Sequence, residues 1–316
     1  MSVSPLEHCQ RGQGAKCSTC QTWNTICDGR AEVGDWMSPT VLLTGATGFV
    51  GRQVLRSLGD HGLPIRAIVR EGKEALVIGS RNLERVIATK DLFAEKSEWW
   101  ADACAGIDTI IHVAWYAESG KYLQSAKNFD CLAGTLEMAQ GAVDACVRRV
   151  VGIGTCFEYD LTAGDLSIET SLRPTTPYAE AKAKAFRALS TIFSQHEIEF
   201  AWCRLFYLHG EGEDLRRLVP YIRSKLSAGE FAELTSGNQV RDFLDVRVAA
   251  EMIVNTAIGS KQGAINTCSG VPISVRALAE QIADEYGRRD LLKFGARPDN
   301  LVDPPRVVGI LDQKPI

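Results

Sequence analysis

The sequence predicts an α/β fold, in which a doubly wound parallel sheet carries a small α/β cap toward its C-terminus. The first observation is an alternation of short apolar runs with longer helical-period segments, without hairpin turns, from residue 41 to residue 205. The second is the apolar run at 41–43, which leads into three glycines spaced three residues apart and then into an amphipathic segment. The third is a looser pattern beyond Gly210, typical of a smaller domain.

Each element of the predicted fold follows from its own run of residues. Strands are predicted at 41–43, 63–70, 86–87, 108–114, 149–154 and 200–205, and short ones at 243–246 and 265–267. Helices are predicted directly after the glycines and at 122–146, 177–195, 216–228 and 274–286. The helix at 177–195 opens on Pro177, where the missing N–H of proline costs nothing.

Gly45, Gly48 and Gly51 have the spacing that a dinucleotide pyrophosphate requires. The first glycine permits a sharp turn, the second lets backbone N–H groups reach the phosphates, and the third lets the helix pack against the strand. The helix N-terminus adds partial positive charge. Glycines at this spacing also occur in the turns of other α/β units. The predicted strand before them and the predicted helix after them favour a nucleotide site. The predicted cofactor contacts of this turn are Gly45, Thr47, Gly48, Phe49, Val50 and Gly51.

The chain is therefore divided into three parts. Residues 1–37 are predicted to be a disordered extension, and residues 38–210 a dinucleotide-binding domain of the Rossmann type. Residues 211–316 are predicted to be mostly a substrate-binding cap, with strands that return to the core.

Bulk composition excludes several classes of protein. Of the 316 residues 45% are apolar and 23% charged, which is ordinary for a globular protein. The net charge of −4 argues against a nucleic-acid or anionic-membrane binder, because such proteins carry a basic excess. No apolar run is long enough to cross a membrane, and the N-terminus lacks the apolar core of a signal peptide. We expect a cytoplasmic protein with no nucleic-acid or membrane partner.

Four cysteines, Cys9, Cys17, Cys20 and Cys27, crowd the N-terminal extension. Cys17 and Cys20 have zinc-knuckle spacing, and His8 or the other two cysteines could complete the ligand set. A structural zinc site normally uses two such close pairs around an ordered span, and this stretch has one pair and few apolar residues. The prediction is therefore no metal site.

Tyr178 and Lys182 lie four residues apart in a predicted helix and so share one face. A tyrosine can exchange a proton with a carbonyl or alcohol if its pKa falls from about 10 toward 7, and a neighbouring ammonium in a partly dry site helps to lower it. Thr155 follows a predicted strand, at the edge where open α/β sheets bind ligands, and its hydroxyl could hold the same substrate oxygen. Tyr178, Lys182 and Thr155 are the candidate catalytic residues.

Together these motifs make the chain from about residue 39 onward resemble the extended short-chain dehydrogenase/reductases, in their nucleotide-sugar epimerase/dehydratase/reductase branch. The resemblance rests on six motifs in family order, at residues 45–51, 112–115, 154–159, 178–182, 204–210 and 240–243. It implies that Tyr178 is the proton donor or acceptor, that Lys182 binds the nicotinamide ribose and tunes the tyrosine, and that Thr155 is the hydroxyl partner. It further implies a homodimer through the helices at 122–146 and 177–195.

The resemblance also implies further binding residues. Asp91 and Leu92 are expected beside the adenine, and Ala114 against the cofactor. Arg241 is expected to bind the diphosphate of a nucleotide sugar, and Arg297 resembles a second phosphate-binding position. The predicted substrate-binding residues are Thr155, Tyr207, Arg241 and Arg297.

Departures from the family pattern narrow the reaction. Members that eliminate water carry an acid pair after the catalytic threonine, and here those positions hold Cys156 and Phe157, which argues against a dehydratase. Tyr207 stands where many epimerases have an asparagine. Arg70 ends the second predicted strand, where an arginine favours the 2′-phosphate of NADP over NAD. A solvated loop arginine is the other interpretation.

The sequence thus predicts an NAD(P)-dependent oxidoreductase on a nucleotide-sugar substrate, with NADP favoured by Arg70 and NAD as the other possibility. The segment at 154–159 resembles most the reductases of nucleoside-diphosphate 4-keto-6-deoxyhexoses. A C4 epimerase with tightly bound NAD is the first alternative. A non-catalytic NADP-binding sensor is the second, and the presence of both Tyr178 and Lys182 argues against it.

Overall fold

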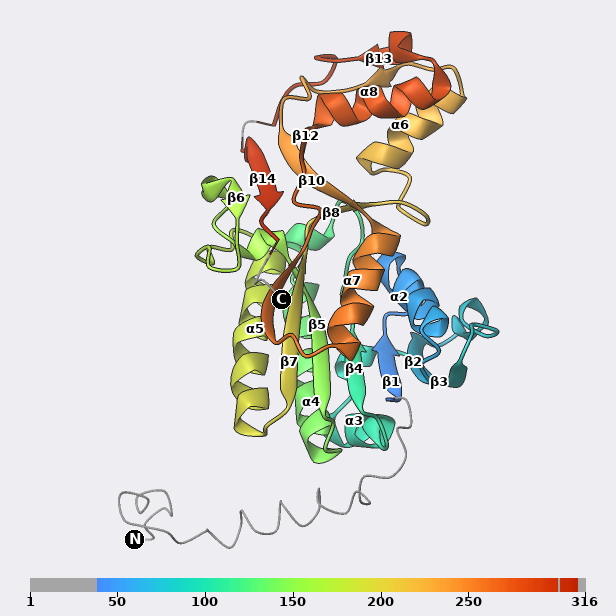
Figure 1. Cartoon of the computed structure of the whole chain (residues 1–316), viewed down its shortest axis with the longest axis vertical. Coiled ribbons are helices and arrows are strands. Elements are labelled where there is room, and N and C mark those ends of the chain that lie inside the picture. Colours follow the sequence, from blue (N-terminus) through green and yellow to red (C-terminus); the bar gives the residue numbers. More distant parts are fainter. Residues whose placement is uncertain (1–38, 301, 312–316) are drawn as a thin grey trace, which may run out of the picture. The chain divides into compact units, whose positions relative to one another are not determined.

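A seven-stranded parallel sheet forms the centre of the computed structural model, which describes residues 39–300 and 302–311 (Figure 1). The strand order is β11-β7-β5-β4-β1-β2-β3, and every neighbouring pair is parallel. The strands are β1 (Val41–Thr44), β2 (Ile65–Arg70), β3 (Leu83–Thr89), β4 (Thr109–His112), β5 (Arg149–Thr155), β7 (Glu199–Leu205) and β11 (Gly263–Thr267). The predicted doubly wound α/β fold is confirmed. The predicted extension at 1–37 and its cysteines lie outside the described residues.

Helices cover both faces of this sheet (Figure 1). α2 (Phe49–Asp60) packs beside α7 (Val246–Ile258) on one face. α3 (Ser97–Cys104), α4 (Lys127–Asp144) and α5 (Pro177–Gln195) pack side by side on the other. Because the chain winds outward in both directions from β1 and β4, the connections diverge there and leave a crevice at the carboxyl ends of these strands.

The strands alternate between two apolar cores. Leu43 and Val151 face one core, with Leu58 of α2 and Ile253 of α7. Their neighbours Leu42 and Val150 face the other, with Met138 of α4 and Phe193 of α5. Successive side chains of a strand point to opposite faces, so strands covered on both sides are apolar throughout. This explains why the strands appear in the sequence as continuous apolar runs.

The chain also forms a second, smaller sheet. Its strands have the order β12-β10-β14-β6, with β8 beside β10. β10 runs parallel to β8 and β14 and antiparallel to β12. Its strands are β6 (Asp165–Leu166), β8 (Tyr207–His209), β10 (Val240–Asp245), β12 (Pro272–Ser274) and β14 (Arg306–Gly309).

The helices α6 (Leu218–Ser227) and α8 (Val275–Tyr286), with the short strands β9 (Ala232–Glu233) and β13 (Leu292–Lys293), form the cap, which has an apolar core of its own. α6 and α8 pack together through Ile222, Leu226 and Ile282. The pair of two-residue strands, β9 and β13, borders these helices.

Two helical segments differ from what the sequence pattern predicts. α7, which no prediction included, comes from the C-terminal third of the chain and covers the main sheet. The predicted helix at 122–146 is divided, because the Asn128 side chain donates to the carbonyls of Tyr122 and Ser125 at 2.6 and 2.8 Å and α4 begins after that turn. Short 3-10 helices are η1 (Glu74–Leu76), η2 (Leu92–Ala94), η3 (Tyr122–Gln124), η4 (Cys156–Glu158), η5 (Leu161–Ala163) and η6 (Arg289–Leu291). None of the helices described has the length and apolar character to span a bilayer.

Candidate active site

The glycine turn after β1 is as tight as the motif predicts. Gly45 has a φ of +73°, and a Cβ there would lie 2.7 Å from the backbone nitrogen of Ala114. A Cβ on Gly51 would overlap the carbonyl oxygen of Gly45, so α2 can approach β1 only without a side chain at this position. Gly48 caps α2 in an extended conformation. The turn is a cradle of backbone that fits a dinucleotide pyrophosphate.

A buried histidine joins the strands behind this turn. Nδ1 of His112 is 3.0 Å from the hydroxyl of Thr44, and Nε2 is 3.1 Å from the hydroxyl of Thr135 on α4. The Thr44 hydroxyl also accepts from the N–H of Ala114 at 3.1 Å. Burial, with the charge of Lys182 adding to it, lowers the pKa of His112 to about 3. His112 therefore stays neutral and fixes β4 against β1.

One cavity of about 810 Å³ runs along the carboxyl ends of the strands. It brings together all the predicted cofactor residues: Gly45, Thr47, Gly48, Phe49, Val50, Gly51, Arg70, Asp91, Leu92, Ala114 and Lys182. Thr155, Tyr178 and Tyr207 line the same cavity. The two remaining predicted residues, Arg241 and Arg297, are not among its lining residues.

Three cations line the end of the cavity that the glycine turn faces. Arg70 is the exposed last residue of β2, and Lys73 and Lys90 line the wall with it. Asp91 lies next to them and caps η2 by accepting from the N–H of Phe93 at 3.1 Å. This part of the cavity wall therefore carries three basic side chains and one carboxylate.

Lys182 lies deep in the wall of the cavity, on α5. Its Nζ donates to the carbonyl oxygen of Ile153 at 2.6 Å and lies 3.7 Å from the ring centroid of Trp115. Burial lowers the pKa of Lys182 to about 7, although the negative charge of Glu158 raises it. The sequence predicted Lys182 but gave no sign of Trp115 as its neighbour.

Tyr178 faces Thr155 and an aromatic neighbour. Its ring meets that of Tyr122 edge-on, with centroids 4.8 Å apart. Burial raises the pKa of Tyr178 well above its usual range, although a side-chain hydrogen bond with Thr155 lowers it. This differs from the expected fall toward 7, because burial outweighs that bond and the Lys182 ammonium is directed to Ile153. The phenol is thus held in its protonated form.

The predicted phosphate-binding arginines have protein partners. The Arg241 side chain is 4% exposed and its Nη2 lies 2.6 Å from Oδ2 of Asp303. Its guanidinium is 5.4 Å from the ring centroid of Tyr207, which does line the cavity. Arg297 lies on the cap surface, where its Nη2 donates to the hydroxyl of Tyr221 at 2.9 Å. Arg241 thus lies behind the cavity wall and Arg297 on the cap.

Sequence reasoning missed two groups of the cavity wall. Tyr122, in η3, packs on Tyr178, and Arg217 from the start of α6 hydrogen-bonds to Tyr122. Arg217 is held by the carboxylate of Glu213 at 3.2 Å. Both residues lie at the start of predicted helices, where a single tyrosine or arginine carries no local signal of such a role.

A glycine turn at the switch point, with a tyrosine and a lysine across the same cavity, defines a dinucleotide-dependent enzyme with a Rossmann-type sheet. Residues 41–265 match the model of the NAD dependent epimerase/dehydratase family. The chain belongs to this family of enzymes, as the sequence motifs predicted.

Known relatives are distant but match along most of their length. The chain is 24% identical over 278 residues to the dTDP-6-deoxy-L-talose 4-dehydrogenase (NAD(+)) of Aggregatibacter actinomycetemcomitans. The aligned region covers 85% of this chain and 98% of that protein. It is 23% identical over 302 residues to a dTDP-4-dehydro-6-deoxy-D-allose reductase of Streptomyces sp., covering 89% and 93%. A UDP-N-acetylglucosamine 4-epimerase structure from Methanobrevibacter ruminantium M1 superposes with a TM-score of 0.77 at 19% identity, covering 87% and 90%. That structure shares the fold.

Proposed function

We propose that the protein is a reductase of a nucleoside-diphosphate 4-keto-6-deoxyhexose. The observation that carries the proposal is the pair of residues after Thr155. Cys156 and Phe157 both line the cavity, and burial raises the pKa of the Cys156 thiol well above its usual range. Neither side chain can act as acid or base at neutral pH, so the site supports addition of hydride and proton to a ketone but no elimination of water. The two relatives named above are a dehydrogenase and a reductase of 6-deoxyhexose nucleotides by their names.

The chain's own residues supply the proton side of this reaction. Reduced nicotinamide supplies the hydride when it is bound. The phenol of Tyr178, held protonated by its burial, donates its proton to the ketone oxygen as that oxygen gains negative charge. The Thr155 hydroxyl hydrogen-bonds to the same oxygen. The ketone thereby gains one hydride and one proton and becomes a secondary alcohol.

The first test measures absorbance at 340 nm with NADPH or NADH and a panel of nucleoside-diphosphate 4-keto-6-deoxyhexoses. We expect cofactor consumption with one of these ketones, and consumption at least about 100-fold slower in the Tyr178→Phe variant. Tyr286→Phe, a tyrosine outside the cavity lining, is the matched control and retains the rate. No consumption by the wild type, with NAD released when the purified protein is denatured, would support a C4 epimerase instead.

We propose that NADP is the preferred cofactor, because Arg70, Lys73 and Lys90 line the cavity together. A hydrogen bond between an arginine and a phosphate contributes about 1.5 to 3 kcal/mol. Arg70→Ala should therefore raise the KM for NADPH about 10- to 100-fold and leave the KM for NADH unchanged. An equal effect on both cofactors would make Arg70 a solvated loop residue. Both cofactors must be compared because the name of the Aggregatibacter relative specifies NAD(+).

We also propose a homodimer through α4 and α5. Phe129 of α4 is 44% exposed, and the Nζ of Lys184 of α5 lies 5.8 Å from its ring centroid. Light scattering on the purified protein should give twice the mass of one chain. Phe129→Glu should shift that mass toward one chain, and a monomeric wild type would overturn the proposal.

A further inference from the structure

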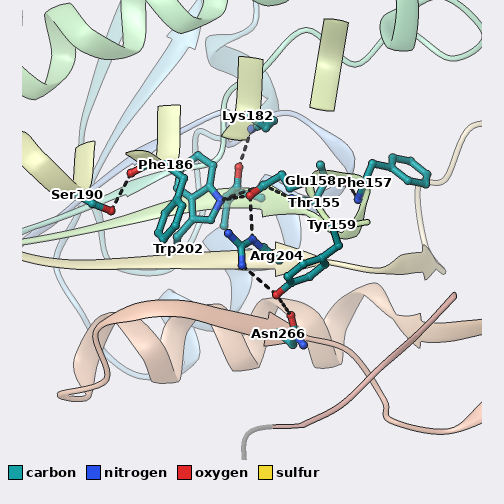
Figure 2. Close-up of polar contacts among 11 residues, drawn as sticks. Thr155, Phe157, Glu158, Tyr159, Lys182, Phe186, Ser190, Trp202, Arg204 and Asn266 are labelled. Carbon is teal, nitrogen blue, oxygen red and sulfur yellow. Dashed lines mark hydrogen bonds and ion pairs between the residues drawn. The ribbon is translucent and has the colours of Figure 1, made fainter. Parts of the chain in front are cut away.

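A buried carboxylate lies just past the end of β5, directly beside Thr155 (Figure 2). Glu158 is fully buried in η4, and its Oε1 accepts from the backbone N–H of Thr155 at 2.8 Å. The indole N–H of Trp202 donates to both carboxylate oxygens, at 3.0 and 3.2 Å. Nε of Arg204 donates to Oε2 at 2.8 Å. Glu158 thus holds Thr155 on one side and is itself fixed by two residues of β7.

The same cluster continues across the sheet (Figure 2). Nη1 of Arg204 donates to the hydroxyl of Tyr159 at 2.9 Å, and that hydroxyl donates to Oδ1 of Asn266 on β11 at 2.7 Å. The amide nitrogen of Asn266 donates to the carbonyls of Leu166 and Ile310, at 2.8 and 3.1 Å. The end of β5 is therefore tied to β7, to β11 and to the segment that follows β14.

Stability alone does not account for this cluster. A fully buried ion pair loses so much hydration that apolar residues of similar volume often stabilise a protein as well or better. The main chain is also adapted to it, because a Cβ on Gly154 would meet the Trp202 indole nitrogen and, at 2.5 Å, the Glu158 carboxylate. A charged pair kept at this cost, next to Thr155, indicates a role in the site.

The charge of Glu158 and the contact of Lys182 with β5 indicate what that role is. Lys182 is hydrogen-bonded to Ile153, two residues before Thr155 on β5. Burial lowers the pKa of its amine to about 7, and Glu158 and, more weakly, Cys131 of α4 oppose this. The pKa of Cys131 is itself raised to about 11 by burial, so its thiol is neutral at neutral pH.

The other groups around Lys182 do not replace that charge. Burial, chiefly, lowers the pKa of His112 on β4 to about 3, so its ring is neutral. Tyr178, one turn away on α5, is a phenol with a raised pKa, again chiefly through burial. Arg204 on β7 is positive and lies on the far side of the Glu158 carboxylate, to which it donates. Glu158 is the negative charge that acts on the Lys182 amine.

We propose that Glu158 is a positioning residue of the active site: its carboxylate, fixed by Trp202 and Arg204, holds Thr155 in place and supplies the negative charge that stabilises the Lys182 ammonium. The inference rests on the proposed function in so far as Thr155 and Lys182 act on substrate and cofactor. The proposal predicts a geometric effect on Thr155 and an electrostatic effect on Lys182, and different substitutions of Glu158 separate the two.

The experiment compares Glu158→Gln, Glu158→Asp and the control Glu169→Gln, an exposed acid in the following loop. Lys182 is titrated by NMR of protein with ¹³C-labelled lysine, its signal assigned from the Lys182→Arg spectrum. We expect Glu158→Gln to lower the Lys182 titration midpoint by about 1 pH unit, because a neighbouring opposite charge is lost. Glu158→Asp keeps the charge and the midpoint, and Glu169→Gln changes nothing.

Kinetics provides the second measurement. Displacement of Thr155 should lower kcat about 10- to 100-fold in both Glu158 variants, with the KM for NADPH unchanged. In Glu158→Gln the alkaline limb of the kcat profile should also move to lower pH, whereas a merely structural defect would scale the profile without moving it. Wild-type kcat together with an unmoved Lys182 midpoint in folded Glu158→Gln overturns the proposal.

The double variant Glu158→Leu, Arg204→Met covers the case in which Glu158→Gln fails to fold because Arg204 is left unpaired. It removes both charges, so no buried charge is stranded. We expect it to fold, with lowered kcat and a lowered Lys182 midpoint, and wild-type values of both would again overturn the proposal. If the wild type reduces none of the ketones, the proposed function fails, while the Lys182 titration still decides the electrostatic role of Glu158.

Discussion

The two ends of the cavity are built in different ways. The cofactor end is built largely by neighbours in the sequence: one turn at 45–51 provides six of the eleven predicted cofactor residues, and its shape depends on missing side chains. The substrate end is assembled from distant segments, with Thr155 at the end of β5, Tyr178 on α5 and Tyr207 on β8. We therefore expect substitutions at the cofactor end to act by distorting the backbone, and substitutions at the substrate end to act by removing reactive groups.

The largest effect should come from the substrate end. Tyr178→Phe removes the proton donor and leaves the ring on Tyr122, so kcat should fall about 100- to 10,000-fold. The melting temperature and the Kd for NADPH should stay those of the wild type, since no cofactor contact is lost. A variant that lost cofactor affinity along with kcat would break the distinction between the two ends.

The next effect tests the cofactor end. Gly51→Ala adds a Cβ that overlaps the Gly45 carbonyl oxygen, so α2 must shift away from β1. We expect a loss of about 1 to 3 kcal/mol in the free energy of unfolding and a large rise in the Kd for NADPH, measured by denaturation and by fluorescence titration. Gly106→Ala is the contrasting control: no atom lies within 4 Å of the new Cβ but its φ is +72°, so it can lose stability through backbone strain and should leave the Kd for NADPH unchanged. Unchanged cofactor affinity in Gly51→Ala contradicts the geometric account.

A third test uses pH to sharpen the comparison. The pKa of Lys182 falls from 10.5 to about 7 through burial, so the folded state carries the cost of a buried ammonium below pH 7. That cost fades as the pH rises toward the unfolded pKa of 10.5. Lys182→Met should therefore gain about 2 kcal/mol or more in unfolding free energy over the wild type at pH 6, with the gain shrinking up to pH 10. If the gain in unfolding free energy did not depend on pH, the titration of Lys182 could not be its cause.

The smallest effect is expected on the cap. Arg297 stacks on Tyr221 at 4.7 Å, outside the lining of the cavity. Arg297→Ala should change the apparent binding energy of the substrate by less than about 1 kcal/mol, as for an exposed contact. Arg241→Gln should have the larger effect on substrate KM, because Arg241 backs Tyr207. The reverse order would place the nucleotide diphosphate over the cap.

How much the sequence could predict depends on the distance over which each signal acts. The glycine turn and α5, which has the predicted bounds 177–195, are set by local rules of spacing and capping. The Arg241–Asp303 pair joins residues 62 apart, and the Arg204–Glu158 pair residues 46 apart. Such pairs depend on the register of strands against one another, which no local pattern encodes.

α7 illustrates the same limit in the fold. Its apolar residues match the main sheet, but it follows β10 of the smaller sheet, so chain order alone assigns it to the cap. Trp115 lies within a predicted motif, yet its contact with Lys182 becomes visible only once β4 and α5 are placed side by side.

The hydrogen bonds of Asn266 also set an order of assembly during synthesis. This one amide joins the carbonyls of Leu166 and Ile310, so its pattern of partners is incomplete until residue 310 has left the ribosome. The close contacts of the glycine turn itself reach only to Ala114, two residues after the end of β4. Because contacts distant in sequence close late, a nascent chain should acquire the shape of a cofactor site long before the support behind Thr155 is complete.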